Sequence, residues 1–190
     1  MDLDQWSPGL IQRRKVFIME CDHMFQTEEI DPSATASSWD SGQVQHRQKN
    51  LFRDKIAEVL RQNPDVSLIA EEAAENQQTF ALEAAKRREI SYANINLFKR
   101  EQLERGFPEN YLMLPEAQQT PFHRTREEYF LDRTIANLPD NGAVLFICGR
   151  LHAERMALMF QGKGYEAALI TLTVDEGFKW DWFIEPFEGF

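Results

Sequence analysis

Short apolar runs alternate with longer amphipathic stretches along this chain, and this alternation restricts the fold more than any other feature. The apolar runs that we predict to be strands are residues 15–19, 66–70, 90–95, 143–148 and 165–174. The stretches with helical spacing of apolar residues lie at 43–62, 76–89, 126–138 and 149–160. Because most of the short runs lack strict polar–apolar alternation, they are typical of a parallel sheet buried on both faces. The sequence therefore predicts an α/β fold, with a mainly parallel sheet and helices on both faces.

A single domain is predicted to span residues 1–190. A chain of this length buries roughly 70% of the surface of its unfolded state, so it needs no disulfide or metal merely to fold. Residues 31–42, rich in Ser, Ala and Thr, are predicted to form a mobile loop. Residues 96–125, which contain Pro121 and other prolines, are predicted to form an irregular excursion. We expect the aromatic tail at 175–190 to pack on the body.

The charge of the chain argues against two classes of partner. The net charge is −10, from 21 Lys and Arg against 31 Asp and Glu. Nucleic acids and anionic membranes both favour clustered cations, so we expect neither as a partner. No apolar run approaches the roughly 20 residues that cross a bilayer, and residues 1–15 lack the apolar core of a signal peptide. Cys21 and Cys148 are too few for a disulfide framework, so we expect a soluble protein of the reducing cytoplasm.

Polar residues follow each predicted strand. In a parallel sheet, ligands bind at the carboxyl ends of the strands, so these residues are the first candidates for a site. They are Glu20, Asp22 and His23; Glu71 and Glu72; Asn94 and Asn96; Gly149, Arg150 and His152; and Thr173 and Asp175. Imidazole and carboxylate groups bind divalent metals and also act as general acids and bases. We therefore predict that His23 and His152 meet in one cleft, with carboxylates around them.

Each candidate also has a simpler structural interpretation, which the sequence leaves open. A lone His23 is at home on a surface, and Glu71 and Glu72 suit the start of a helix, where carboxylates meet the positive end of the helix dipole. Gly149 permits a tight turn into a helix but lacks the further glycines of a dinucleotide-binding loop. Arg126 can simply open a helix, or it can bind a carboxylate or phosphate. The convergence of these residues at one edge of the sheet favours a functional site over the simpler structural interpretations.

The remaining histidines and the cysteines are not assigned to this site. His46 and His123 lie in polar stretches, and nothing in the sequence links them to the strand ends. Cys21 and Cys148 end two apolar runs, where buried structural thiols are a simpler interpretation than a redox pair. The predicted site therefore draws only on residues at strand ends and on Arg126.

Four short segments resemble the TraB/Tiki/ChaN/erythromycin-esterase-like superfamily. They are residues 20–23 at a strand end, 68–72 (LIAEE), 126–130 (REEYF) and 145–152 (LFICGRLH), the last with a Gly-x-x-His motif. The family has an α/β fold and includes proposed metal-dependent proteases, esterase-like hydrolases and a haem-binding protein. The resemblance implies roles for the two motif histidines, His23 and His152, for Glu71 or Glu72, and for Arg126.

The first of the family's two Gly-x-x-His motifs is altered here, because Glu20 stands where glycine is expected. Either Glu20 acts as a ligand or a base, or this half of the site is degenerate and the protein does not catalyse a reaction. The altered motif therefore keeps a non-catalytic protein of the same fold among the alternatives.

The leading hypothesis is a hydrolase-like protein that cleaves an ester, amide or phosphate bond. The predicted site residues are Glu71, Glu72, Arg126 and His152 for catalysis, His23, His152 and Glu20 for a divalent metal, and Asp22, Gly149 and Arg150 beside them. A carboxylate, an imidazole or a metal held by both would activate water, and an arginine would stabilise the developing negative charge. The alternative is a non-catalytic domain that binds an anionic small molecule, haem or a protein. The sequence leaves open whether the substrate is a small molecule or a peptide, and whether the chain forms a homo-oligomer.

Overall fold

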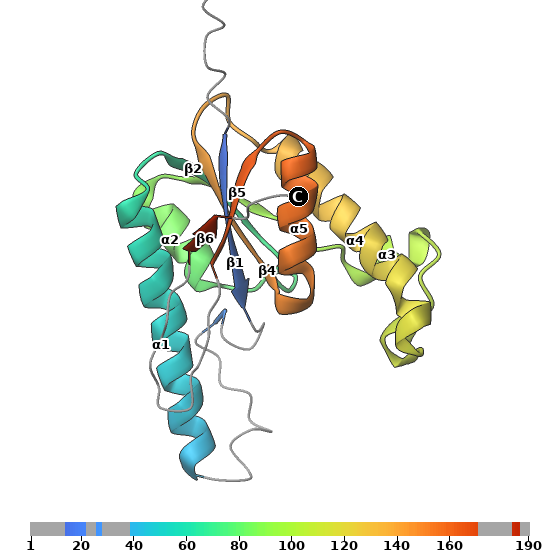
Figure 1. Cartoon of the computed structure of the whole chain (residues 1–190). Coiled ribbons are helices and arrows are strands. Elements are labelled where there is room, and N and C mark those ends of the chain that lie inside the picture. Colours follow the sequence, from blue (N-terminus) through green and yellow to red (C-terminus); the bar gives the residue numbers. More distant parts are fainter. Residues whose placement is uncertain (1–13, 22–25, 28–38, 171–183, 187–190) are drawn as a thin grey trace, which may run out of the picture.

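The computed structural model describes residues 14–21, 26–27, 39–170 and 184–186 (Figure 1). In this part of the chain, the strands form one sheet with the order β3-β2-β4-β1-β5-β6. Their bounds are β1 (Lys15–Cys21), β2 (Val66–Glu71), β3 (Ser91–Asn94), β4 (Ala143–Gly149), β5 (Glu166–Ile170) and β6 (Ile184–Pro186). β1 to β5 are parallel, and β6 pairs antiparallel with β5 at the edge. The predicted α/β fold with a mainly parallel sheet is confirmed.

Helices cover both faces of the sheet, as predicted. Their bounds are α1 (Trp39–Gln62), α2 (Phe80–Arg88), α3 (Lys99–Glu104), the 3-10 helix η3 (Tyr111–Met113), α4 (Glu116–Ala136) and α5 (Arg150–Gly162). Figure 1 shows α1 and α2 on one side of the sheet and α4 and α5 on the other. In the described part of the chain, no helix is long and apolar enough to cross a bilayer.

Strand β4 lies between β1 and β2, and its side chains build both hydrophobic cores. Leu145 and Ile147 pack into the core under α1 and α2, whereas Val144 and Phe146 pack into the core under α4 and α5. This division follows from the alternation of side chains along a strand. A strand that is buried on both faces carries a continuous apolar run, which explains why this strand gave the clearest signal in the sequence.

The chain leaves neighbouring strands for opposite faces of the sheet. After β2 it continues into α2, and after β4 it continues into α5 on the other face. Loops that diverge in this way open a crevice at the carboxyl ends of the strands, which is where ligands bind in such sheets. The residues that follow β2 and β4 are therefore the first to examine for a site.

The prediction of an irregular excursion at 96–125 is wrong. The segment contains α3, η3 and the first turns of α4, which begins at Glu116. Pro121 lies inside α4, where a proline normally ends a helix because it lacks a backbone N–H. The carbonyl that loses its partner belongs to Ala117, which is exposed, so water can satisfy it.

The structure describes only part of two other predicted segments, the mobile loop and the aromatic tail. Residues 39–42 of the predicted mobile loop belong to α1, and residues 31–38 lie outside the described residues. Of the aromatic tail, only Ile184–Pro186 is described, and it forms β6. The predicted packing of the rest of the tail lies outside the described residues.

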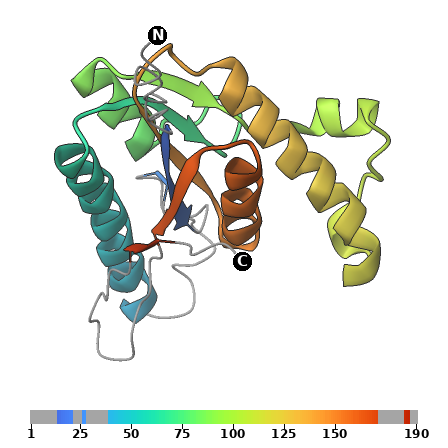
Figure 2. The same cartoon turned by 45° about the horizontal axis from the view of Figure 1, so that its top comes forward.

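Residues 99–123, which we call the arm, project from the body as α3, η3 and the first half of α4 (Figure 2). An aromatic cluster joins the arm to the core. The ring centroids of Phe107 and Tyr111 lie 5.2 Å apart, and those of Phe107 and Phe122 lie 5.0 Å apart. Since Phe107 and Tyr111 are both buried, the arm is anchored at its base by packing.

Candidate functional site

Glu71 and Glu72, at the end of β2, have partners on opposite faces of the sheet. Glu71 Oε2 accepts hydrogen bonds from Thr79 Oγ1 at 2.5 Å and from Tyr92 Oη at 2.8 Å. Thr79 is the N-cap of α2 and also accepts a hydrogen bond from Leu82 N at 3.1 Å. Burial, followed by the Glu71 carboxylate, raises the pKa of Tyr92 far above its usual range. Glu71 therefore ties β2 to α2 and β3.

Glu72 faces the opposite layer and joins two more elements. Its side chain is only 1% exposed and forms an ion pair with Arg126 of α4. Its other oxygen, Oε2, accepts a hydrogen bond from the backbone N–H of Gly149 at 3.0 Å. Gly149 is the N-cap of α5, so the carboxylate lies at the positive end of that helix. The structure thus brings together three of the predicted residues.

Arg126 is the centre of this group. Besides Glu72, it donates a hydrogen bond to Tyr111 Oη at 2.9 Å, and its guanidinium lies 5.4 Å from the centre of the Phe130 ring. Its Nε is buried and has no hydrogen-bond partner among the described residues. A buried donor without a partner costs free energy, and such groups are frequent where a ligand binds.

Glu127 and His152 form a buried carboxylate–imidazole pair. Glu127 Oε1 lies 2.9 Å from His152 Nδ1, and the two side chains are 1% and 6% exposed. Arg155 Nη1 lies 3.1 Å from Glu127 Oε2 and balances its charge. A carboxylate accepts the Nδ1 proton, which leaves a lone pair on Nε2 of the neutral ring. Nε2 of His152 makes no hydrogen bond to the described residues.

His123 is a neighbour of this pair that the sequence interpretation missed. Its ring centroid lies 5.5 Å from that of His152, and its Nε2 lies 3.2 Å from Gln119 Oε1. Its Nδ1 is buried without a partner among the described residues. Burial lowers the pKa of His123, and the positive charge of Arg126 lowers it further, while the Glu127 carboxylate opposes the shift. His123 is therefore a neutral imidazole at neutral pH.

A helical spacing contained the missing signal. His123, Arg126, Glu127 and Phe130 stand at positions i, i+3, i+4 and i+7, which share one face of a helix. The sequence prediction starts this helix at Arg126, because a proline normally breaks a helix and prolines precede this residue. A helix extended towards the N-terminus would have placed His123 and Glu127 on the same face as Arg126.

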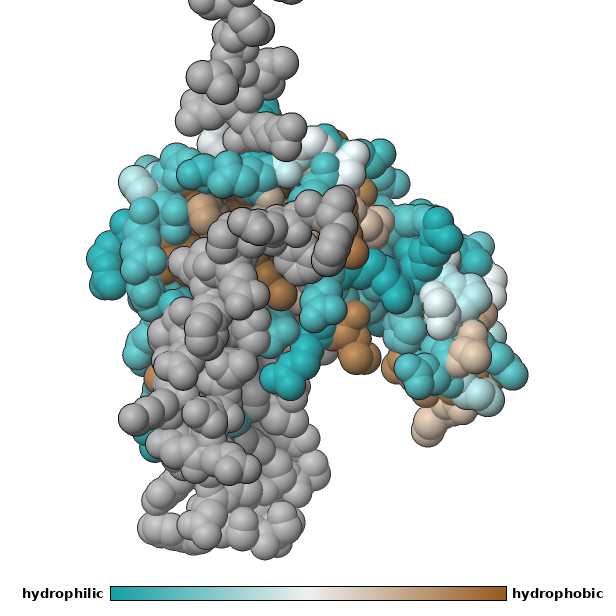
Figure 3. All heavy atoms as spheres, in the orientation of Figure 1, coloured by the Kyte–Doolittle hydropathy of each residue, from teal (hydrophilic) through white to brown (hydrophobic). Residues whose placement is uncertain are grey.

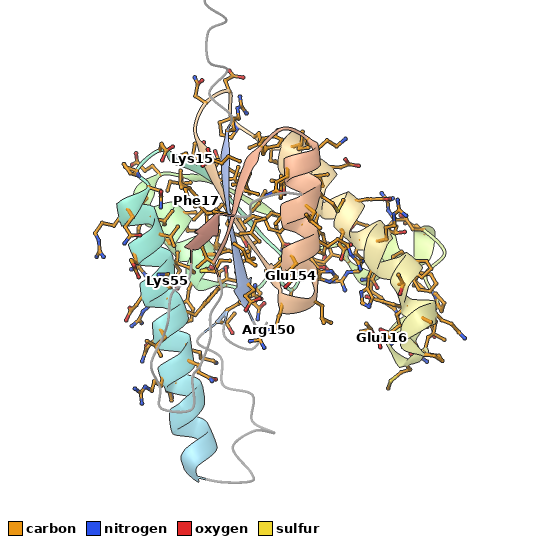
Figure 4. The ribbon with its side chains drawn as sticks, viewed as in Figure 1. Lys15, Phe17, Lys55, Glu116, Arg150 and Glu154 are labelled. Carbon is orange, nitrogen blue, oxygen red and sulfur yellow. The ribbon has the colours of Figure 1, made fainter. Side chains whose placement is uncertain are left out.

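Glu20, at the end of β1, contributes a third carboxylate. It is 7% exposed, and its Oε1 lies 3.6 Å from Arg150 Nε. Burial raises the pKa of the Glu20 carboxyl, while Arg150 opposes this shift. Figure 4 shows the side chains of Arg150 and Glu154 at the end of α5 that lies beside the tip of β1. The predicted neighbours Glu20 and Arg150 therefore do meet.

Each of these three carboxylates faces an arginine. The pairs are Glu20–Arg150, Glu72–Arg126 and Glu127–Arg155. Within the described residues, no group of three or more His, Cys, Asp or Glu side chains is placed to hold a metal ion. In the described part of the chain, these three carboxylates are thus paired with arginines. The predicted metal ligand His23 and its neighbour Asp22 lie outside the described residues. The predicted meeting of His23 with His152 lies outside them too.

Cys148 is close to the site but is not set up as a nucleophile. It is completely buried at the end of β4. Burial raises its pKa well above the usual range, and the carboxylates of Glu72, Glu20 and Glu127 raise it further. Because the thiolate is the reactive form of cysteine, Cys148 remains an inert thiol.

A separate pocket lies at the amino ends of β2 and β3, lined by residues that include Asn63, Ser67, Arg88 and Ser91. Arg88 uses its Nη1 to donate a hydrogen bond to the carbonyl of Leu60 at 2.7 Å. The pocket contains none of the residues at the carboxyl ends of the strands, where the partnerless nitrogens lie. The candidate site is therefore the cluster at the carboxyl ends.

Comparison of the chain with protein family models, with curated proteins and with solved structures gave no match. The resemblance to the TraB/Tiki/ChaN/erythromycin-esterase-like superfamily accordingly stays a prediction.

Proposed function

We propose that this protein is a hydrolase in which His152 acts as the general base on a water molecule. The observation that carries the proposal is the buried pair of Glu127 and His152, with 2.9 Å between Oε1 and Nδ1. A carboxylate in this position holds the imidazole in one orientation and stabilises the imidazolium once it forms. The proposal agrees with the resemblance stated above, because that superfamily includes esterase-like hydrolases.

The reaction would proceed in two proton-transfer steps. His152 Nε2 takes a proton from water while the water oxygen forms a bond to the carbonyl carbon of the substrate, giving a tetrahedral oxyanion. The imidazolium then gives this proton to the leaving oxygen or nitrogen as its bond to carbon breaks. The products are an acid and an alcohol or amine, and His152 returns to its neutral form.

Arg126 supplies the second requirement of such a reaction, which is stabilisation of the oxyanion. Its buried Nε has no partner among the described residues, so one N–H is available as a donor. Glu72 and Tyr111 hold the other end of the guanidinium in place. A donor that is fixed before the reaction stabilises developing charge without having to reorganise.

A divalent metal would supply the same activation of water, by lowering the pKa of a bound water molecule. Of its predicted ligands, only Glu20 and His152 lie within the described residues, and Glu20 faces Arg150. The proposed reaction therefore uses the side chains of this chain.

The proposal is tested by the variants His152→Ala and Glu127→Gln, assayed on chromogenic carboxylic esters and anilides. Loss of a general base lowers kcat by about 10²–10⁴-fold. We expect both variants to lose activity in this range, because Glu127→Gln leaves the base His152 without the carboxylate that orients it. Glu128→Gln is the matched control, because Glu128 is the next residue of α4, is exposed and pairs with Arg124 at 3.2 Å. Its activity should equal that of the unchanged protein.

Three results would overturn this assignment. Full activity of His152→Ala, with circular dichroism showing a folded protein, would remove His152 from the mechanism. No hydrolysis of any ester or anilide by the unchanged protein would favour the non-catalytic binding domain instead. Activity that disappears with a chelator and returns with Zn²⁺ or Mn²⁺ would replace the metal-free mechanism by the metal-dependent one.

A further inference from the structure

We infer that the substrate of this site is uncharged at the scissile bond and carries an apolar group beside it, which Leu151 and the exposed residues of η3 receive. The inference rests on the proposed function, because it names the substrate class of the same site. Three observations support it: the exposed apolar side chains, their connection to the site, and the balance of charge.

Large apolar side chains are exposed on two elements that border the site. Leu151 of α5 is 83% exposed, while Met113 and Leu112 of η3 are 87% and 61% exposed. Leu151 directly precedes His152 in the first turn of α5. Single exposed apolar residues are normal on a protein surface, but apolar residues that border a polar site are typical of a binding site.

Hydrogen bonds connect η3 to the same site. Tyr111, its first residue, accepts a hydrogen bond from Arg126. Gln119 donates a hydrogen bond to the carbonyl of Leu112 at 3.1 Å, and its Oε1 lies 3.2 Å from His123 Nε2. Gln119 therefore links the backbone of Leu112 to His123, whose ring centroid lies 5.5 Å from that of His152. Figure 3 shows a hollow between the arm and the body, with hydrophobic surface on both of its sides.

The charges at the site favour an uncharged substrate. The arginines of the site each face a carboxylate, in the three pairs described above. A phosphate ester brings one or two negative charges and is bound best by arginines whose charge is not already balanced. An ester or amide carbonyl brings no net charge and needs only one donor for its oxyanion, which the Nε of Arg126 can supply.

The test compares p-nitrophenyl acetate, p-nitrophenyl hexanoate and p-nitrophenyl phosphate. We expect kcat/KM for the hexanoate to exceed that for the acetate by about 10-fold or more, since each methylene in an apolar site adds selectivity. The phosphate should not be hydrolysed. Leu151→Asp and Met113→Asp should each lower the ratio of kcat/KM for hexanoate to that for acetate by several-fold. The substitution removes apolar contact area, and the new carboxylate would have to lose water to contact the acyl chain.

Leu158→Asp is the matched control. Leu158 is also an exposed leucine of α5, at 52%, and lies about two helical turns beyond Leu151. This variant should keep the ratio of the unchanged protein. Equal activity on hexanoate and acetate, a preference for the phosphate, or an equal loss of selectivity in Leu158→Asp would overturn the inference.

A binding measurement separates this inference from the proposed function. N-phenyl-1-naphthylamine is an uncharged apolar fluorophore, and its binding needs no hydrolysis. We expect Leu151→Asp to weaken its binding several-fold and Leu158→Asp to leave it unchanged. If the protein hydrolyses none of the esters but binds the fluorophore in this pattern, the apolar site stands and the hydrolase proposal fails. If it hydrolyses esters but Leu151→Asp leaves both selectivity and binding unchanged, the hydrolase proposal stands and this inference fails.

Discussion

The two neighbouring imidazoles of the site, His123 and His152, are held by different partners. His152 is oriented by the Glu127 carboxylate, whereas His123 meets the neutral amide of Gln119. Cations and burial around His123 both oppose its protonation, because neither stabilises a further positive charge. The pair therefore consists of one ring oriented by a carboxylate and one ring held neutral beside it.

This difference predicts the titration of His123. Its pKa should lie below the ordinary value of 6.5, since burial acts first and the positive charge of Arg126 acts in the same direction. The folded protein then takes up this proton less readily than the unfolded chain, so His123 lowers stability as the pH falls through 6.5 towards its folded pKa. Nuclear magnetic resonance of the imidazole protons, assigned with His123→Gln, measures this value. A midpoint at or above 6.5 would contradict the arrangement described.

Part of the site could be predicted at the level of residues. The rule that polar residues gather at the carboxyl ends of parallel strands selected Glu72, His152 and Glu20 correctly as neighbours of that edge. The rule could not tell which of Glu71 and Glu72 belongs to the site. Adjacent side chains of a strand point to opposite faces of the sheet, and the rule does not say which of the two faces α4 and α5. It also missed Glu127 and His123, which belong to a helix and so do not follow any strand.

The ion pair of Glu72 and Arg126 connects elements that are distant in the sequence. It joins the end of β2 to the middle of α4, and through Gly149 and Tyr111 it reaches α5 and η3. Both partners are largely buried, with side chains 1% and 12% exposed. Removal of one partner leaves the other as an uncompensated charge in the interior.

Glu72→Gln should therefore lower the free energy of unfolding by about 3–5 kcal/mol, which is typical for breaking a buried pair. The matched control is Glu83→Gln, which removes the exposed pair of Glu83 with Arg87 on α2, where the side chains are 42% and 70% exposed. That change should cost no more than about 0.5 kcal/mol. Urea denaturation of both variants makes the comparison. Equal effects would show that the Glu72 pair is as well solvated as the surface pair.

At the level of elements, apolar pattern predicted the strands better than the helices. The described start of each of β1 to β5 lies within one residue of its predicted start. The predicted start of helix α4 is ten residues too late, because Glu116 rather than Arg126 is its first residue. A proline is a local signal against a helix, and only the exposure of the preceding turn, a property of the folded molecule, allows it here. The antiparallel β6 was not predicted, since a strand of three residues carries too little pattern.

The molecule as a whole contains two hydrophobic cores that share one sheet. Phe52 of α1 is buried in the core on one face, and Phe160 of α5 is buried in the core on the other. Strands β1 and β4 supply alternate side chains to both cores. Loss of packing on one face therefore destabilises the sheet, and the core on the other face depends on the same sheet.

Phe52→Ala and Phe160→Ala should accordingly each lower the free energy of unfolding by about 3–5 kcal/mol, the usual cost of removing a buried phenylalanine. Because the sheet is shared, both changes should move the same cooperative transition. Urea unfolding followed by circular dichroism and by amide hydrogen exchange tests this expectation. Exchange that accelerates only on the face carrying the substitution would show that the two layers unfold independently.

The opposite directions of Glu71 and Glu72 restrict how the length of this chain can vary. Deletion of one residue within β2 would turn every later side chain of the strand to the other face, so each carboxylate would meet the wrong layer. Residues added or removed between η3 and α3 leave both carboxylates where they are. Insertions and deletions among related sequences should therefore gather in the arm and be absent from β2.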